Sequence, residues 1–197
     1  MFNTKQTNLK VKTIFISCMA ASVMLMSCGG NGDKAAAGEA TATDAAAATD
    51  KHYTAADLVD LDLSSSGIAV VTKAPKDAKV MKYEVNGDIC VYGGKFFKLT
   101  FSTMDGAAVD NFSMLKEMTS DKELNSSFDK FEAEDGDSFL KKNKKGEFAF
   151  IRSIDAGGKT VNISEGMPYD ISPDQFSDYS ADDVKIMYEA AKATAAK

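Results

Sequence analysis

Short runs of apolar residues, separated by turn signals, occupy the middle of the chain. Residues 68–71 form a β-branched run that ends at a proline-containing turn signal. Two further runs, residues 80–85 and 88–92, are joined by Asn86-Gly87, a strong hairpin signal. Residues 96–103, with the sequence FFKLTFST, follow at once. These patterns predict four consecutive strands.

The apolar period then changes to that of a helix over residues 107–122. Apolar residues recur there at spacings of three and four, which places them on one helical face. The members of this face are Ala108, Phe112, Leu115 and Thr119, widened by Val109, Met114 and Met118. We expect an amphipathic helix that buries this face.

A second β-rich part follows this helix. Residues 128–132 and 138–142 indicate strands, and residues 147–154 alternate apolar and polar positions. Residues 155–159 (DAGGK) indicate a turn, after which residues 160–164 return as the partner of the preceding strand. The pattern therefore predicts a second set of hairpins.

The last predicted element is a helix that begins at Ser180. The Ser180 side chain can cap free backbone N–H groups, and Asp182 and Asp183 complement the positive charge of a helix start. Its apolar face consists of Val184, Met187, Tyr188 and Ala191. The order of elements predicts an α+β fold, an α/β/α sandwich whose mostly antiparallel sheet is covered by two helices. We assign this single domain to residues 53–197.

Residues 1–27 have the pattern of an export signal. The first twelve residues contain three lysines and no acid, and residues 13–26 carry no charge. This run is shorter than the ~20 residues that a membrane-spanning helix needs. The following Leu25-Met26-Ser27-Cys28 resembles the lipobox of bacterial lipoproteins, which implies that Cys28 carries the lipid. The alternative is an ordinary signal peptide with an incidental cysteine.

Residues 28–52 are interpreted as the lipidated cysteine and a flexible linker. Residues 29–50 contain no aromatic and no large aliphatic side chain, so they cannot bury enough apolar surface to offset the entropy of ordering. Gly29 follows the cysteine and no aspartate comes next, which favours the outer membrane among lipoproteins of the enteric type. We therefore expect a lipid-anchored protein of the cell envelope, on either face of that membrane.

Removal of the signal segment would leave 20 basic and 29 acidic residues, a net charge near −9. Such a charge disfavours nucleic acid as a partner and keeps the protein soluble beside an anionic membrane. With Cys28 acylated, Cys90 would be the only free thiol, so no intramolecular disulfide is expected.

A weak family resemblance emerges from the order and spacing of residues 53–192. The residues that carry it are Val59-Asp60-Leu61, Gly67, Ala74-Pro75, Lys116, Phe148-Ala149-Phe150, Gly158-Lys159 and a helix around Val184 to Met187. Together they resemble PsbP-related lipoprotein domains of Bacteroidota-type bacteria. The resemblance implies an α/β/α sandwich used as a non-enzymatic accessory or binding module, and it supplies no catalytic residues.

Two single residues have the chemistry of a site but lack partners in the sequence. His52 is the only histidine and lies where the linker meets the domain, so we interpret it as an exposed linker residue rather than a metal ligand or base. Cys90 lies between Ile89 and Val91 in a predicted strand. We expect it to be buried and inert.

Two charged clusters are the remaining candidates. The acidic cluster invites a calcium site, but its spacing does not fit a calcium-binding loop, so a solvated acidic turn is favoured. Its members are Glu132, Glu134, Asp135 and Asp137. The basic cluster, at a predicted hairpin tip, is a candidate contact for an anionic partner, although such lysines also protect sheet edges, and the two clusters can instead pair with each other. Its members are Lys141, Lys142, Lys144 and Lys145.

The function expected from the sequence is a non-catalytic binding or accessory module of the envelope, without a cofactor. No phosphate-binding glycine loop, nucleophile elbow, H-E-x-x-H or Cys-x-x-Cys motif is present. The partners expected are the bilayer, through the acyl chains, and an unidentified protein or small molecule. The alternatives are an envelope enzyme that uses dispersed carboxylates such as Glu132 and Asp135, and a structural subunit that makes contact through the basic cluster.

Overall fold

The computed structural model describes residues 51–166 and 179–197, which belong to one compact unit, Thr43–Lys197. The predicted signal segment, Cys28 and the linker up to residue 50 lie outside the described residues. Within the described part, the fold is α+β with antiparallel sheets and two α-helices, as the sequence predicts.

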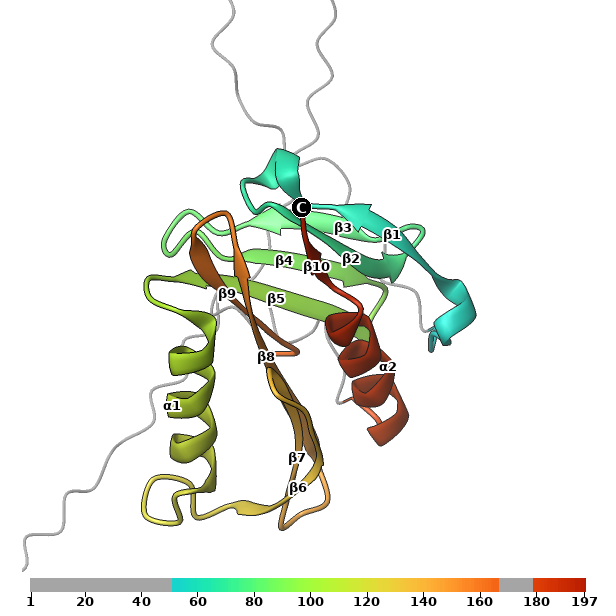
Figure 1. Cartoon of the computed structure of the whole chain (residues 1–197). Coiled ribbons are helices and arrows are strands. Elements are labelled where there is room, and N and C mark those ends of the chain that lie inside the picture. Colours follow the sequence, from blue (N-terminus) through green and yellow to red (C-terminus); the bar gives the residue numbers. More distant parts are fainter. Residues whose placement is uncertain (1–50, 167–178) are drawn as a thin grey trace, which may run out of the picture. The chain divides into compact units, whose positions relative to one another are not determined.

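A seven-stranded sheet forms the centre of the domain (Figure 1). In spatial order its strands are β3 (Lys79–Lys82), β4 (Ile89–Gly93), β5 (Phe97–Met104), β9 (Lys159–Ser164), β8 (Phe148–Ala156), β7 (Ser138–Asn143) and β6 (Phe128–Glu134). Every neighbouring pair is antiparallel. The predicted hairpins therefore lie next to one another, and β5 and β9 join the two β-rich parts into one sheet.

A second, three-stranded sheet packs beside the first. Its strands are β1 (Leu58–Asp62), β2 (Val70–Pro75) and β10 (Ala195–Ala196), and two short 3₁₀ helices, η1 (Ala55–Asp57) and η2 (Ser64–Ser66), flank β1. The strand predicted at residues 68–71 is displaced, because β2 begins at Val70 and continues through the expected turn signal to Pro75, where it pairs with Leu58. Neither β1 nor β10 was predicted as a strand.

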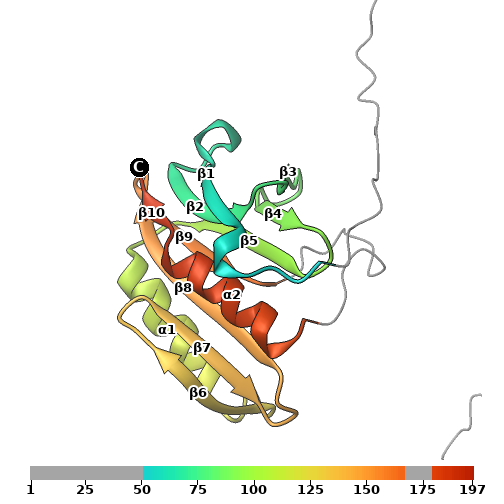
Figure 2. The same ribbon diagram turned by 90° about the vertical axis from the view of Figure 1, so that its right-hand side faces the viewer.

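The two α-helices, α1 (Ala108–Ser120) and α2 (Ala181–Lys192), lie on opposite faces of the large sheet (Figures 1 and 2). Helix α1 contacts β8, β9 and β6, whereas α2 contacts β8, β5, β9 and also β2 of the small sheet. The side of the sheet that α2 covers carries the main hydrophobic core. This arrangement confirms the prediction of a mostly antiparallel sheet with two covering helices.

Helix α2 buries the face that its period predicts. Val184, Met187, Tyr188 and Ala191 are at most 2% exposed, and the Tyr188 ring packs against Phe150 of β8 at 5.6 Å between centroids. Full burial of such side chains stabilises the fold by roughly 1.5–3 kcal/mol for each large apolar group. The helix therefore joins the two sheets through one continuous core.

The apolar face predicted for α1 is only partly right. Val109, Met114 and Met118 are 44–65% exposed, so the widening of the buried face is wrong. Asn111 is buried instead, because its side-chain amide donates to Thr160 Oγ1 at 3.1 Å and to two backbone carbonyls. A polar residue with all these partners can replace an apolar one against the sheet, which rotates the buried face.

Two turns determine how the hairpins close. The β8–β9 connection is the two-residue turn Gly157-Gly158, with φ of 62° and 78°, the conformation that suits a tight hairpin. The β3–β4 connection is longer than the predicted two-residue turn at Asn86-Gly87. It spans the six residues between Lys82 and Ile89, and Tyr83 N donates to Asp88 O across it. Gly87 still adopts a positive φ of 76°.

Candidate functional site

Among the described residues, a cleft of about 490 Å³ has a volume within the range of small-molecule sites. We call it the inter-sheet cleft, because its lining comes from the large sheet and from the segment that leads into β2 of the small sheet. Its roof is formed by residues 66–69, the segment that leads from η2 into β2. Its floor is formed by the ends of β3, β4, β5, β9 and β8 in the large sheet.

The strand register explains why the floor is apolar in its middle. Ile89 pairs with Lys82, and Val161 pairs with Thr103, so side chains from adjacent strands point to the same face. Ile89 and Val161 are buried, at 1% and 0% exposed. They therefore present apolar surface to the bottom of the cleft rather than to solvent.

Two lysines supply the charge of the inter-sheet cleft. Lys82 ends β3 and Lys159 begins β9, directly after the Gly157-Gly158 turn. The Lys82 Nζ lies 3.5 Å from the position that a Cβ atom would occupy at Gly67, so the ammonium group reaches the roof. Within the described residues, the side chain of neither lysine forms a hydrogen bond or an ion pair.

Among the described residues, no carboxylate lines the inter-sheet cleft. The two aspartates that adjoin lining residues in sequence, Asp88 and Asp155, form hydrogen bonds with other groups. Asp155 Oδ1 accepts from Ala108 N at the start of α1, on the other face of the sheet, and Asp88 Oδ2 accepts from Asn86 Nδ2. The cleft is thus a locally positive site on an acidic protein, which favours an anionic ligand.

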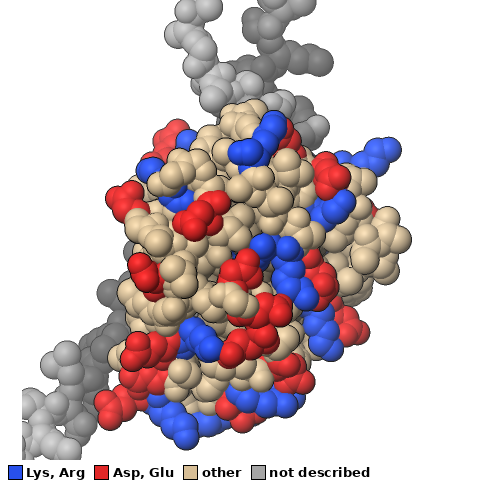
Figure 3. Space-filling model, viewed as in Figure 1, with Lys and Arg blue, Asp and Glu red and all other residues tan. Residues whose placement is uncertain are grey.

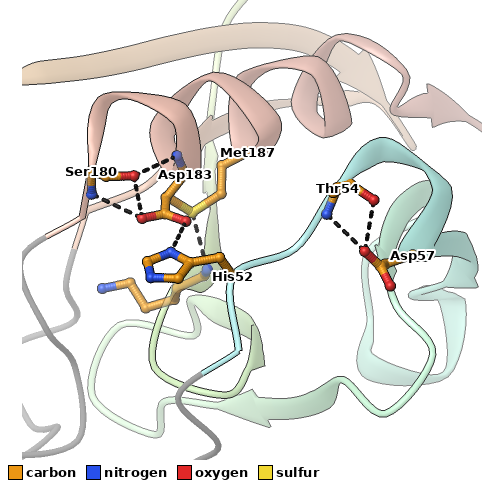
Figure 4. A network of polar contacts seen from close by, with 7 residues as sticks. His52, Thr54, Asp57, Ser180, Asp183 and Met187 are labelled. Carbon is orange, nitrogen blue, oxygen red and sulfur yellow. Dashed lines mark hydrogen bonds and ion pairs between the residues drawn. The ribbon is translucent and has the colours of Figure 1, made fainter.

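A second polar group surrounds the start of α2 (Figure 4). His52 Nδ1 lies 2.8 Å from Asp183 Oδ1, and the imidazole stacks on Phe96 with 3.9 Å between ring centroids. Ser180 Oγ accepts from Asp183 N at 3.2 Å, which is the cap expected for Ser180. Asp183 Oδ2 accepts in return from the Ser180 backbone and hydroxyl, which completes a capping box. The His52 side chain is exposed, as expected, but its contacts with Asp183 and Phe96 hold it against the domain. The preceding residue, Lys51, forms an ion pair with Asp57.

A third group lies on the face of β4 and β5 that is turned away from α2. Cys90 is fully buried, as the sequence predicts, and burial raises the pKa of its thiol to about 12. Burial lowers the pKa of Lys98 to about 8, against the opposing effects of Cys90 and Glu165. Burial also raises the pKa of Glu165, whose Oε2 accepts from Phe150 N at 2.9 Å. A thiol with a raised pKa is a poor nucleophile.

The acidic cluster is divided among separate ion pairs around the β6–β7 hairpin. Glu132 pairs with Lys130 at 2.9 Å and Glu134 with Lys116 at 2.7 Å. Asp137 Oδ2 accepts from Arg152 at 2.9 Å. The hydrogen bond from Lys130 holds the pKa of Glu132 below its ordinary value. Within the part of the chain that the structure describes, no group of three or more possible ligands is placed to hold a metal ion.

The basic cluster lies at a hairpin tip, but its lysines point in different directions. Lys141 and Lys142 are consecutive in β7 and so face opposite sides of the sheet. Lys142 lies over the Phe148 ring, with Nζ 5.6 Å from the centroid, and Lys144 donates to Ser126 O at 2.7 Å. Lys145 is exposed in the turn. The face drawn in Figure 3 likewise shows acidic and basic residues interspersed, without a patch of one sign.

Comparison with known proteins does not assign a family or a function to the chain. No family model, no curated protein and no solved structure matches the chain. None of the helices among the described residues is long and apolar enough to cross a membrane.

The sequence did not indicate Lys82 or Lys159 as functional residues. They are separated by about half of the domain in sequence, and neither belongs to a charge run. Lys159 ends a predicted turn and belongs to the family resemblance, but neither pattern gives its side chain a role. The only signals that mark the inter-sheet cleft are the glycines of its turns, Gly67, Gly87 and Gly157, each with a positive φ. Those glycines indicate turns, and only the strand order brings the turns together.

Proposed function

We propose that the chain is a lipid-anchored envelope protein whose domain is a non-catalytic binding module for a small molecule. The single observation that carries the binding role is the inter-sheet cleft, which has the volume of a ligand site and an apolar floor with polar groups at its rim. The anchor in this proposal is Cys28, with attachment to the outer membrane. The domain in this proposal is PsbP-like, and helices on both faces of an antiparallel sheet are in keeping with that.

The chemistry of the cleft lining favours binding over catalysis. Its polar side chains are two lysines and the hydroxyls of Ser66 and Thr103. General acid–base or nucleophilic catalysis uses a nucleophile within reach of an oriented base, and neither a carboxylate nor an imidazole lines this cleft. An enzyme based on Glu132 has less support, because pairing with Lys130 keeps that carboxylate ionised.

The test is a search for ligands with a variant that fills the cleft. The full lipidated chain, held in a nonionic detergent, is screened against small molecules by the shift of its melting temperature. Thr103→Phe places a ring over the cleft floor, and Val85→Phe places the same ring at a position that is 88% exposed and outside the cleft. We expect ligands that stabilise the unmodified chain and the Val85→Phe chain but not the Thr103→Phe chain.

Two results would overturn the proposal. Ligands that stabilise the Thr103→Phe chain as well as the unmodified one would place the site elsewhere. Chemical conversion of a bound molecule, followed by mass spectrometry, would show that the domain is catalytic.

A further inference from the structure

From the placement of Lys82 and Lys159 we infer that the inter-sheet cleft binds an elongated organic dianion, with one acidic group at each lysine and an apolar middle over Ile89 and Val161. This inference rests on the proposed binding function and names the chemical class of the ligand. It concerns side chains that no sequence motif assigns.

The strand order separates the two lysines across the sheet. Lys82 belongs to β3 and Lys159 to β9, and β4 and β5 lie between these strands. Three strand spacings of about 4.8 Å place the two strand axes roughly 14 Å apart. One compact anion fits this spacing less well than a molecule with two separated charges.

The roof limits how far apart the two acidic groups are. The Lys82 ammonium lies beside Gly67, at 3.5 Å from its Cβ position, whereas the Cβ position of Gly157 lies 3.8 Å from Ala69 Cβ. Gly67 and Ala69 are two residues apart, and two extended residues span at most about 7 Å. Because Lys159 follows the Gly157 turn closely, a chain of about six carbons, with the two acidic carbons included, suits the cleft.

The floor between the lysines determines the middle of the ligand. Ile89 and Val161 are the buried side chains beneath the cleft, and Thr103 adds a hydroxyl at its edge. A methylene chain would cover apolar surface there, at roughly 25 cal/mol for each Å² removed from water. A ligand with polar groups along its whole length would leave some of them without partners.

The free charge of the two lysines supports an acidic ligand rather than a neutral one. Among the described residues, the side chains of Lys82 and Lys159 form no ion pair, so the charge of each is available to a ligand. Lys73 and Lys116, by contrast, are paired with Asp60 and Glu134. Two ammonium groups in one cleft without a carboxylate repel each other, and a dianion removes that repulsion.

The experiment measures binding of three matched probes to the full chain by titration calorimetry. The probes are hexanedioate, hexanoate and 1,6-hexanediol, which carry two, one and no charges on similar carbon chains. We expect hexanedioate to bind most tightly and the diol most weakly. Hexanediol bisphosphate, run beside hexanedioate, distinguishes phosphate from carboxylate as the preferred acidic group.

Single-lysine variants then assign each charge. Lys82→Gln and Lys159→Gln should each weaken hexanedioate binding roughly fivefold at low salt, since each removes one exposed charge pair. Neither should change binding of the diol. Lys79→Gln is the matched control, because Lys79 lies on the same strand as Lys82, is exposed, and does not line the cleft.

The outcomes separate this inference from the function on which it rests. The inference of a dianionic ligand is wrong if hexanedioate binds no more tightly than hexanoate. It is also wrong if Lys79→Gln weakens hexanedioate binding as much as Lys82→Gln does. The proposed binding function still holds after that result if another ligand raises the melting temperature of the unmodified chain but not of the Thr103→Phe chain. If no ligand distinguishes the Thr103→Phe chain, the binding function itself fails.

Discussion

Asp183 joins the first turn of α2 to His52, at the start of the described domain. Its side chain is 3% exposed, and it accepts hydrogen bonds from Ser180 and contacts His52 (Figure 4). We predict that Asp183→Ala lowers the free energy of unfolding by about 1 kcal/mol, because it removes one half of the capping box and the contact with His52. Urea unfolding at neutral pH measures this change.

The neighbouring Asp182 provides the control. Its side chain is 93% exposed and forms a 3.7 Å ion pair with Lys185, so Asp182→Ala should change stability by less than about 0.5 kcal/mol. Equal effects of the two substitutions would contradict the capping role of Asp183.

The effect of Asp183→Ala should also depend on pH. Burial acts to raise the pKa of Asp183, but hydrogen bonds from Ser180 and His52 outweigh it and hold the pKa below its ordinary value. A carboxyl group with a lowered pKa stabilises the fold above its unfolded pKa of about 3.9, and that contribution is lost as the pH falls through the folded pKa. The stability difference between the unmodified chain and the variant should therefore shrink below about pH 4. A difference that stays constant down to pH 2 would contradict this linkage.

At the scale of elements, the C-terminus of α2 depends on an arginine from the sheet. Arg152 of β8 donates to the carbonyl oxygens of Ala191 and Thr194 at 2.6 and 2.8 Å, and to Lys192 O as well. These are carbonyls that a helix end leaves without partners. The same guanidinium binds Asp137, so one side chain connects α2, β8 and the β6–β7 hairpin.

We predict that Arg152→Lys lowers the free energy of unfolding by about 2 kcal/mol. A lysine keeps the charge but cannot donate to the carboxylate and to several carbonyls at once, since it lacks the planar fork of the guanidinium. Lys192→Gln is the control, because it removes a charge at the same helix end while its ion pair with Glu189 is largely exposed. Thermal unfolding of both variants measures the contrast. Full retention of stability in Arg152→Lys would show that charge alone holds the helix end.

The sequence correctly predicted the elements that depend on residues close to one another along the chain. The Ser180 cap, the period of α2 and the Gly157-Gly158 turn each depend on residues within one or two turns of chain, and each is present. β10 is two alanines without a strand signal, and it exists because it pairs with β2 across the whole domain. In α1 the predicted residues Ala108, Phe112 and Thr119 are buried, but Val109, Met114 and Met118 were wrongly added to that face. Periodicity counts apolar residues and does not reveal that Asn111 has a partner in the sheet.

At the scale of the molecule, the candidate site follows from topology. The inter-sheet cleft draws on five adjacent strands and on the η2–β2 segment, which are dispersed from Ser66 to Val161 in sequence. Nothing local distinguishes Lys82 from Lys79, yet strand alternation directs them to opposite faces. The sequence therefore predicted the fold class and the helix faces in part, whereas the cleft required the order in which the strands pair.

The charge of the whole molecule and the proposed anchor lead to the last prediction. An acidic domain is repelled by anionic lipid, so we propose that attachment to the membrane comes from acyl chains, each buried methylene of which contributes about 0.8 kcal/mol. Cys28→Ala should abolish incorporation of labelled palmitate, while Cys90→Ala should retain it, because Cys90 is buried in β4. Exchange of residues 1–28 for an ordinary cleavable export signal should yield a soluble chain with an unchanged melting temperature. Palmitate in the Cys28→Ala chain, or membrane attachment of the exchanged chain, would show that the anchor lies elsewhere.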